Sequence, residues 1–392
     1  MASVASESKS KSKSKKDDVL TSFKSEENGV LSFTLENVNV SIANAIRRTI
    51  LSDIPVLVVH CFPHNENQAT FHKNTSRLNN EILKQRLSAI PIHIKDHDLP
   101  YSELVIEINV KNKSENTINV TTEDFKIKNL TTGKYLQDSA VRKIFPPCPI
   151  TGDYIQFARL RPEVSTVSPG EELNITAKMS LHTASEDGSY NVASTCAYKF
   201  SPDKIRQDEA WQSKLLEISE EEKKDADVIG LLQQNWYNHE GLRYFRKNSF
   251  DFKVETIGVF DNNELVTKAC DILKSKLMSF SEMAMNDLSV EKSLNTLQHS
   301  VDITLPNTGY TIGKIIEYML HNNYYVGEKA KLFSYVGFSK PHPHDDDSII
   351  RVAFVEKPNN EDATIEVITK GLVKVACDEA IQIIEEIRKD FA

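Results

Sequence analysis

The densest group of side chains able to bind a metal ion lies in one short segment near the end of the chain. Imidazole and carboxylate groups are common ligands of divalent metals, and a bound metal could activate water in an enzyme that acts on nucleotides. Two prolines and three successive aspartates between strand-like segments are, however, typical of an exposed hairpin loop. We therefore expect no bound metal or cofactor and keep the metal-dependent nucleotide-processing enzyme as the alternative function. The members of this group are His342, His344, Asp345, Asp346 and Asp347.

The other histidine, cysteine, serine and carboxylate side chains do not form recognisable catalytic motifs. His60, His64 and His72 have neither helical spacing nor the glutamate of a zinc-protease motif, so we expect them on an ordinary polar surface. The chain has no glycine-rich phosphate loop, no serine nucleophile elbow and no magnesium-binding carboxylate triplet. Its five cysteines include no C-x-x-C pair, which predicts free and mostly buried thiols. We expect no catalysis by the chain itself.

The composition is that of a globular protein with two or three domains, since 40% of the 392 residues are hydrophobic and 26% are charged. No segment approaches the roughly 20 apolar residues of a membrane span, and the first residues are charged where a signal peptide would be apolar. We expect a soluble intracellular protein without membrane contact. The net charge of -9 argues against broad contact with a nucleic-acid backbone and favours protein partners.

The first 18 residues have a composition of their own. Ala2 to Asp18 mixes serine with five lysines and has almost nothing apolar to bury, so we expect a disordered tail. A nuclear-import signal or a nucleic-acid patch would share this composition with a merely solvated run of charge, and these alternatives stay open.

Strands and helices are predicted on both sides of a β-rich middle section. Gly29 to Leu35 is expected to form a strand, and Ser41 is expected to cap a helix that Pro55 prevents from continuing. The apolar residues from Arg77 to Ile90 recur at helical spacing and predict a second helix.

The middle of the chain alternates apolar and polar residues from Tyr101 to about Phe200, which predicts an inserted β-rich domain. A polar, acidic helical stretch then leads to Phe250 to Glu255, a strand expected to rejoin the first sheet. We assign residues 19–100 and 241–290 to a first half, residues 101–240 to the insert with its helical return, and residues 291–392 to a second half.

Two longer segments, Glu264 to Met285 and Ala363 to Phe391, have clear helical periodicity. The second carries an apolar seam that would be ~45 Å long as a single helix, and such a seam needs a partner. We expect the two halves to bury their apolar faces against each other within the chain. The residues predicted to pair are Ile46, Ile50, Ile312, Ile316, Ile272, Phe280, Leu372, Ala376, Ile383 and Ile387.

One pattern occurs twice in the chain. Residues 33–46 align without gaps to residues 303–316, with five identical positions, and each copy fits a strand, a turn bearing asparagine and a capped helix. Ser41 and Thr311 stand at equivalent cap positions. Five matches can also arise by chance between common strand-turn-helix units. The repeat favours two half-domains related by a pseudo-two-fold axis.

At these residues the chain resembles the family of the bacterial RNA polymerase alpha subunit N-terminal domain and its eukaryotic relatives, the third and eleventh subunits of RNA polymerase II. Asn44 to Pro55 is similar to the N-A-[LI]-R-R helix of the larger partner, and Asn74 to Ile92 is similar to its N-T-S…I-P segment. Thr311 to Ile316 and Val336 to Val352 are similar to the helix start and the P-H-P hairpin of the smaller partner.

The resemblance implies an α+β fold, in which antiparallel sheets and long packed helices form a two-layer dimerisation platform with the β-rich domain inserted. It implies a non-catalytic subunit of a DNA-directed RNA polymerase that contacts the largest, the second-largest and small subunits. Arg47, Arg48 and Arg86 are implied to contact these partners, although a solvated helix surface is the alternative. Neither sequence-specific DNA contact nor homo-oligomerisation is implied.

Fusion of both partners in one chain is similar to the arrangement in some large DNA viruses. It would place the protein in the virion and the host cytoplasm, or in the nucleus if the source is not viral. Tyr310 replaces the usual histidine of the motif, and the insert lacks the cysteine cluster that binds zinc or an iron-sulfur centre in several relatives. A third interpretation is a scaffold that descends from polymerase subunits but serves another complex.

Overall fold

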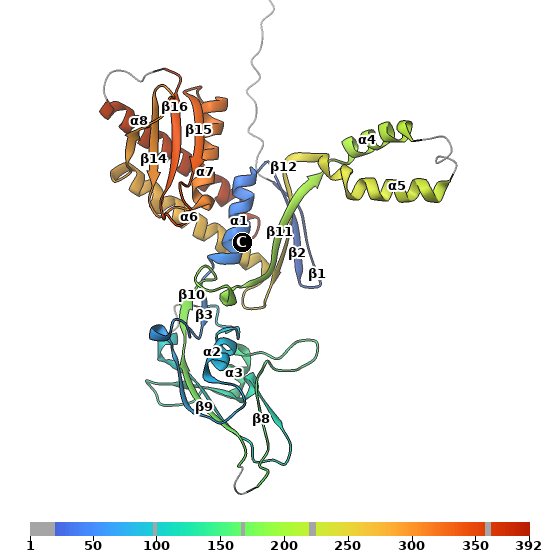
Figure 1. Ribbon diagram of the computed structural model, residues 1–392, viewed down its shortest axis with the longest axis vertical. Helices are drawn as coiled ribbons and strands as arrows, with labels where there is room; N and C mark the ends of the chain where they lie inside the picture. The colour runs from blue at the N-terminus through green and yellow to red at the C-terminus, as the bar shows by residue number, and fades with distance from the viewer. Residues whose placement is uncertain (1–19, 97–99, 166–168, 219–224, 357–361) are drawn as a thin grey trace, which may run out of the picture.

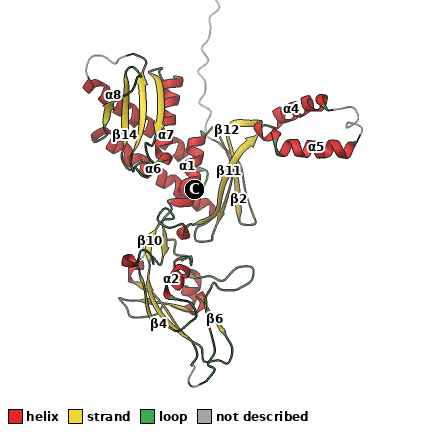
Figure 2. Ribbon diagram, viewed as in Figure 1, coloured by secondary structure: helices red, strands yellow, loops and turns green. Residues whose placement is uncertain are grey.

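The computed structural model describes residues 20–96, 100–165, 169–218, 225–356 and 362–392. The expected disordered tail, Ala2 to Asp18, lies outside the described residues. Helices and antiparallel strands combine in a mixed α+β fold, with two sheets in an upper platform and a separate β-rich unit below them (Figures 1 and 2).

The first sheet has four antiparallel strands in the order β1-β2-β12-β11. The sequence predicted β2 and the strand that rejoins it, but not β1. Asn28 and Gly29 both have positive φ in the two-residue turn between β1 and β2, the conformation that favours an Asn-Gly hairpin. The strands and helices of this half are β1 (Leu20–Glu27), β2 (Val30–Glu36), α1 (Val40–Ser52), β11 (Ala193–Pro202), β12 (Phe245–Thr256) and α6 (Asn262–Asn286).

The second sheet has the order β13-β14-β16-β15 and is also antiparallel. Both halves therefore run strand, strand, helix, strand, strand, helix, and both sheets arrange their strands in the same order. The elements of this half are β13 (Val290–Lys292), β14 (Ser300–Leu305), α7 (Tyr310–Leu320), a π-helical turn η7 (His321–Val326), β15 (Phe333–Ser339), β16 (Ser348–Phe354) and α8 (Asp362–Lys389).

The repeated sequence pattern has the same backbone conformation in both copies. Asn37 has a φ of 62° between β2 and α1, and Asn307 has a φ of 47° at the aligned position between β14 and α7. Asparagine tolerates this left-handed region better than most residues. The conformations support an internal repeat rather than a chance match.

The predicted helix caps are wrong in both copies. The helices begin at Val40 and Tyr310, which lie before the expected caps Ser41 and Thr311. Asn39 caps α1 instead, and its Oδ1 accepts a hydrogen bond from the Ser41 backbone N–H at 2.8 Å. Gly309 precedes α7 and has no side chain to provide a cap.

The β-rich unit contains a four-stranded sheet in the order β4-β9-β5-β7 and a two-stranded ribbon of β6 and β8. Two short helices and several 3-10 turns complete it. Its strands and helices are β4 (Ala69–Asn74), α2 (Asn80–Ser88), β5 (Leu104–Lys111), β6 (Ile118–Thr121), β7 (Phe125–Asn129), α3 (Asp138–Ile144), β8 (Gln156–Leu160) and β9 (Glu172–Lys178).

The core of this unit begins earlier in the chain than the expected boundary at residue 101. Leu83 and Leu87 of α2 are buried among the strands of the insert rather than in the first half, and the buried cluster extends from Leu57 to Met179. The apolar face of α2 is covered by β4 and β8. The assignment of residues 69–100 to the first half is therefore wrong, and so is that of β11 to the insert, whereas residues 56–58 contribute to both cores.

Two further pieces connect these units. A neck of β3 (Val56–Val58) paired with β10 (Ser180–His182) carries the chain into and out of the insert. An arm of α4 (Lys204–Glu217) and α5 (Ala226–Asn238) leaves the first sheet between β11 and β12 and projects sideways (Figure 2). The acidic helical return expected within the insert is thus an arm of the first sheet.

Candidate functional site

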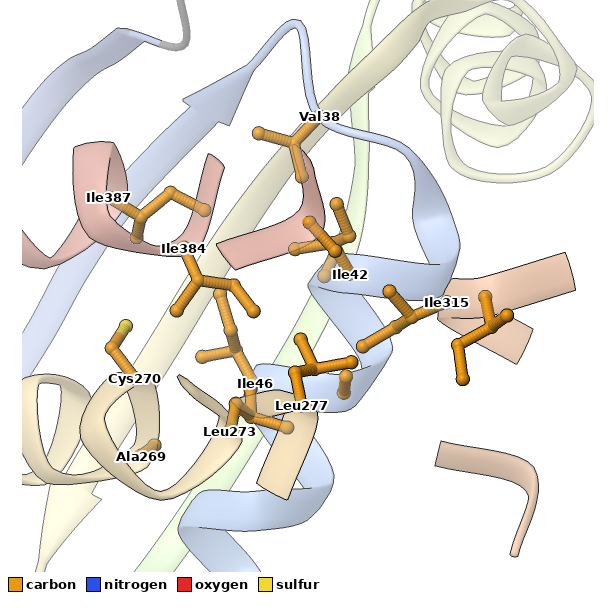
Figure 3. Packing of buried hydrophobic residues seen from close by; sticks show 14 of the residues in the cluster. Val38, Ile42, Ile46, Ala269, Cys270, Leu273, Leu277, Ile315, Ile384 and Ile387 are labelled. Atoms are coloured by element: carbon orange, nitrogen blue, oxygen red, sulfur yellow. The ribbon is translucent and has the colours of Figure 1, made fainter. Parts of the chain in front are cut away.

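The ten residues expected to pair the halves all belong to one hydrophobic cluster that joins the two sheets. Figure 3 shows Ile42 of α1 close to Ile315 of α7, and Ile46 of α1 among side chains of α6 and the end of α8. Burial of one such side chain stabilises a protein by about 1.5–3 kcal/mol. Six of the ten are buried: Ile46, Ile50, Phe280, Ile316, Ala376 and Ile387. Four are partly buried against the cluster: Ile272, Ile312, Leu372 and Ile383.

The long helices α6 and α8 lie side by side in opposite directions. Arg388 Nε donates to Asp271 Oδ1 at 2.6 Å, and Lys274 Nζ lies 2.5 Å from Glu385 Oε1. Residue numbers rise along one helix as they fall along the other, which defines an antiparallel pair. Because these ion pairs are solvent-exposed, they contribute register and direction more than stability.

The end of the chain crosses onto the first sheet. The ring of Phe391 meets that of Phe33 edge-on at 4.8 Å, and Lys24 Nζ lies 4.5 Å from the centre of the Phe391 ring. Asp390 accepts from Thr21 Oγ1 at 2.6 Å through its side chain and from Lys24 Nζ at 2.9 Å through its carbonyl. The sequence ended the apolar seam at Phe391 but did not identify these contacts.

A surface groove lies where the N-termini of α1 and α7 approach each other. Arg48 is exposed and lines it, whereas Arg47 is half-buried and its Nε donates to Asn44 Oδ1 at 3.0 Å. Tyr310, at the position where the resembling motif has histidine, packs its ring 5.2 Å from that of Phe338. The other residues along the groove are Val40, Ser41, Asn44, Ala45, Tyr198, Thr311 and Lys314.

Arg86 lies in a different part of the molecule from Arg47 and Arg48. It stands on α2 in the β-rich unit, and its Nη2 donates to the backbone carbonyl of Gln156 at 2.7 Å. The structure thus gives Arg86 a contact that links α2 to β8. It does not bring the three arginines together into one surface.

The loop from His342 to Asp347 connects β15 to β16 and is exposed. His342 Nδ1 accepts from the His344 backbone N–H at 3.1 Å, and Asp347 Oδ1 accepts from the Asn307 backbone N–H at 3.0 Å. Two of the candidate ligands therefore accept backbone hydrogen bonds, one within the loop and one from the turn before α7. Across the part of the chain that the structure describes, no three histidine, cysteine, aspartate or glutamate side chains are grouped so as to hold a metal ion.

The histidines and cysteines outside this loop lie partly on the surface and partly in the interior. His64 and His72 are exposed, but His60 is buried, so its assignment to the surface is wrong. Four of the five cysteines are buried, and burial raises the pKa of Cys196, Cys270 and Cys377 to about 12. These thiols stay protonated and unreactive at neutral pH. None of the described helices combines the length and apolar character needed to span a membrane.

Comparison with known proteins identifies similar chains. A family model described as the RNA polymerase Rpb3/Rpb11 dimerisation domain matches residues 32–277. DNA-directed RNA polymerases IV and V subunit 3B of Arabidopsis thaliana is 24% identical, over 66% of this chain and 88% of its own length. DNA-directed RNA polymerase subunit Rpo3 of Methanosphaera stadtmanae is 27% identical, over 62% and 90%. DNA-directed RNA polymerases I and III subunit RPAC1 of Saccharomyces cerevisiae is 24% identical, over 62% and 81%.

Proposed function

Because this chain belongs to the RNA polymerase Rpb3/Rpb11 dimerisation domain family, we propose that it is a non-catalytic assembly subunit of a multisubunit DNA-directed RNA polymerase. One observation carries the proposal: two half-domains with the same order of strands and helices bury α1, α6, α7 and α8 in one core. The nucleotidyl-transfer activity then belongs to the whole complex.

The second half provides within the chain the partner that a separate subunit would otherwise supply. Its sheet repeats the strand order of the first, and its last residues pack on Phe33. A tether raises the effective concentration of one half around the other to the order of millimolar and fixes their ratio at one to one. We infer a monomeric chain that presents a complete platform.

The surfaces that would recruit the two large catalytic subunits include the groove between α1 and α7. Arg48 is the arginine best placed for such a contact. It is exposed in the groove, and its guanidinium makes no hydrogen bond or ion pair among the contacts that the structure describes. Arg47 would support the surface through Asn44. Arg86 would act on another face, where the insert meets a partner, and small polymerase subunits would bind elsewhere.

Affinity purification from producing cells tests the assignment. The tagged chain is expected to recover the largest and second-largest polymerase subunits, and Arg48→Glu is expected to reduce that recovery at least several-fold. Arg243→Glu, at an exposed position in the turn at the base of the arm, is the matched control for charge and exposure. Recovery of a complex without large polymerase subunits would instead favour a scaffold of another assembly.

Two properties separate this proposal from its rivals. The purified chain should have the mass of a monomer, and a stable homodimer with exchanged halves would contradict intrachain pairing. The metal-dependent enzyme predicts bound metal and an activity that a chelator removes, and elemental analysis of the protein tests this directly.

If the source is viral, as the fused arrangement suggests, the complex belongs in the virion and host cytoplasm; otherwise it belongs in the nucleus.

A further inference from the structure

The neck between the platform and the insert belongs to both hydrophobic cores. Val56 and Val58 of β3 are buried in the platform core, whereas Leu57 between them is buried in the core of the insert. Successive side chains of a strand point to opposite faces, so one short strand contributes to both cores. Figure 1 shows β3 and β10 at the junction of the two units.

Two histidines stack at this junction. His60 follows β3, His182 ends β10, and their imidazole rings are nearly parallel, with centroids 4.0 Å apart and planes 7° apart. His60 is only 6% exposed. Charge on these rings therefore matters, because two protonated imidazoles at this separation would repel each other strongly in a poorly solvated site.

A neutral ring is able to satisfy both hydrogen bonds of His60. Its Nε2 lies 3.3 Å from the Glu66 carboxylate, which can only accept, so Nε2 carries a proton. Its Nδ1 lies 3.0 Å from the Tyr190 hydroxyl. Burial raises the pKa of Tyr190 to about 12, so the phenol keeps its proton and is able to donate it to Nδ1. A neutral imidazole with its proton on Nε2 satisfies both partners.

A charged ring is able to satisfy both hydrogen bonds of His182. Its Nδ1 lies 2.5 Å from Glu186 Oε2, and its Nε2 lies 2.9 Å from Ser180 Oγ. The Ser180 hydroxyl donates its only proton to Gln68 Oε1 at 2.9 Å, so it accepts from Nε2. Both ring nitrogens therefore donate. The bond from His182 also holds the pKa of Glu186 below its usual range.

We propose that His60 and His182 form a one-proton latch that fixes the insert on the platform. A second proton, on His60 Nδ1, would remove the acceptor of the Tyr190 hydroxyl and place two cations face to face. Loss of a proton from His182 would remove the positive charge beside the Glu186 carboxylate and leave one of the two ring nitrogens without a hydrogen to donate. Either change loosens the neck. The titratable and charged groups around the pair are Glu66, Glu186, Asp187, Tyr190, Cys61 and, beside Cys61, Lys84.

The charge of each ring can be measured in the unmodified protein. Nitrogen-15 NMR of the imidazoles at about pH 7 is expected to show both nitrogens of His182 protonated and His60 neutral with its proton on Nε2. A neutral His182, or a charged His60, at this pH would overturn the proposal. This measurement does not depend on any variant folding correctly.

Hydrogen exchange tests whether the charge controls the neck. Protection factors at β3 and β10, corrected for intrinsic exchange, are expected to fall as the solution is acidified, by up to about tenfold per pH unit, which is the slope for one proton taken up on opening. His60→Gln should abolish this acid dependence, and His182→Gln should abolish the corresponding loss of protection at higher pH. His72→Gln, an exposed histidine on β4, is the matched control and should behave as the unmodified chain. Neck protection that is independent of pH, or equally dependent in His60→Gln, would refute the latch.

Discussion

The ring of Phe391 in the penultimate position of the chain packs edge-on against Phe33 in a central strand of the first sheet, with centroids 4.8 Å apart. Phe33 in turn stacks on Phe252 at 4.9 Å. This contact lets the end of the second half complete the core of the first. Hydrogen bonds from Thr21 and Lys24 to Asp390 hold it in register.

Truncation of this aromatic contact is expected to destabilise the whole platform. Phe391→Ala removes a buried ring and leaves a cavity beside Phe33, which costs about 3–5 kcal/mol for a phenylalanine in a core. Chemical denaturation measures the loss. Phe23→Ala on the neighbouring strand β1 is the control, since Phe23 is 55% exposed and its loss should change the stability by no more than about 0.5 kcal/mol. Equal effects of the two substitutions would contradict a core role for Phe391.

Acid is expected to weaken the second sheet through Asp302. Hydrogen bonds from Arg351 at 2.6 and 2.7 Å hold the pKa of Asp302 below its usual range. A carboxylate with a depressed pKa contributes stability that is present above the ordinary value near 3.8 and is lost as pH falls through the lowered one. Asp302→Asn should therefore be less stable at neutral pH and should show a flatter decline below about pH 4. Denaturation at a series of pH values measures both; parallel declines would refute the assignment.

The sequence predicted the elements whose signals are local and repeated. The bounds of α6 and α8 agree with the expected helices to within two residues, because a long apolar stripe at helical spacing is compatible with few structures other than a helix. The repeat identified two copies of one unit, and the matching left-handed conformations of Asn37 and Asn307 follow from it. The platform fold was predictable for these reasons.

Apart from the two helix caps, the errors concern which surfaces meet, and local patterns do not determine this. The apolar face of α2 could cover either sheet, and only the tertiary structure shows that Leu83 and Leu87 cover the strands of the insert. His60 ends an apolar run, residues 56–59, that is a local signal for its burial, but its partners His182 and Tyr190 are far along the chain. Contacts across such distances require the closed fold.

The arm of α4 and α5 should unfold separately from the platform. Its small core contains Trp211 and Trp236, which are buried 5.7 Å apart and are the only two tryptophans in the sequence. Tryptophan fluorescence therefore reports the arm, whereas far-ultraviolet circular dichroism reports mainly the platform and insert. We expect the fluorescence transition at a lower denaturant concentration, because the arm packs mainly on itself and the turn at its base. Coincident transitions would instead indicate that the arm unfolds with the rest.

Severing the chain between the halves tests the pairing most directly. The connection between α6 and β13 is only a few residues long, and a cut after Asp287 separates two fragments that share one core. Co-expressed fragments are expected to purify together, since the seam of α8 still packs on α6 and the first sheet. Ile384→Asp with Ile387→Asp in the second fragment should abolish this association, because both side chains are fully buried.

The cut also changes how stability depends on concentration. In the intact chain the pairing is intramolecular, so its thermal midpoint should not change on dilution. The separate fragments must find each other in solution, and their midpoint should fall as the concentration decreases below the millimolar range that the tether provides. Differential scanning fluorimetry over a hundredfold dilution series measures both. A concentration-dependent midpoint in the intact chain would mean that the halves pair between molecules, since only a bimolecular equilibrium responds to dilution.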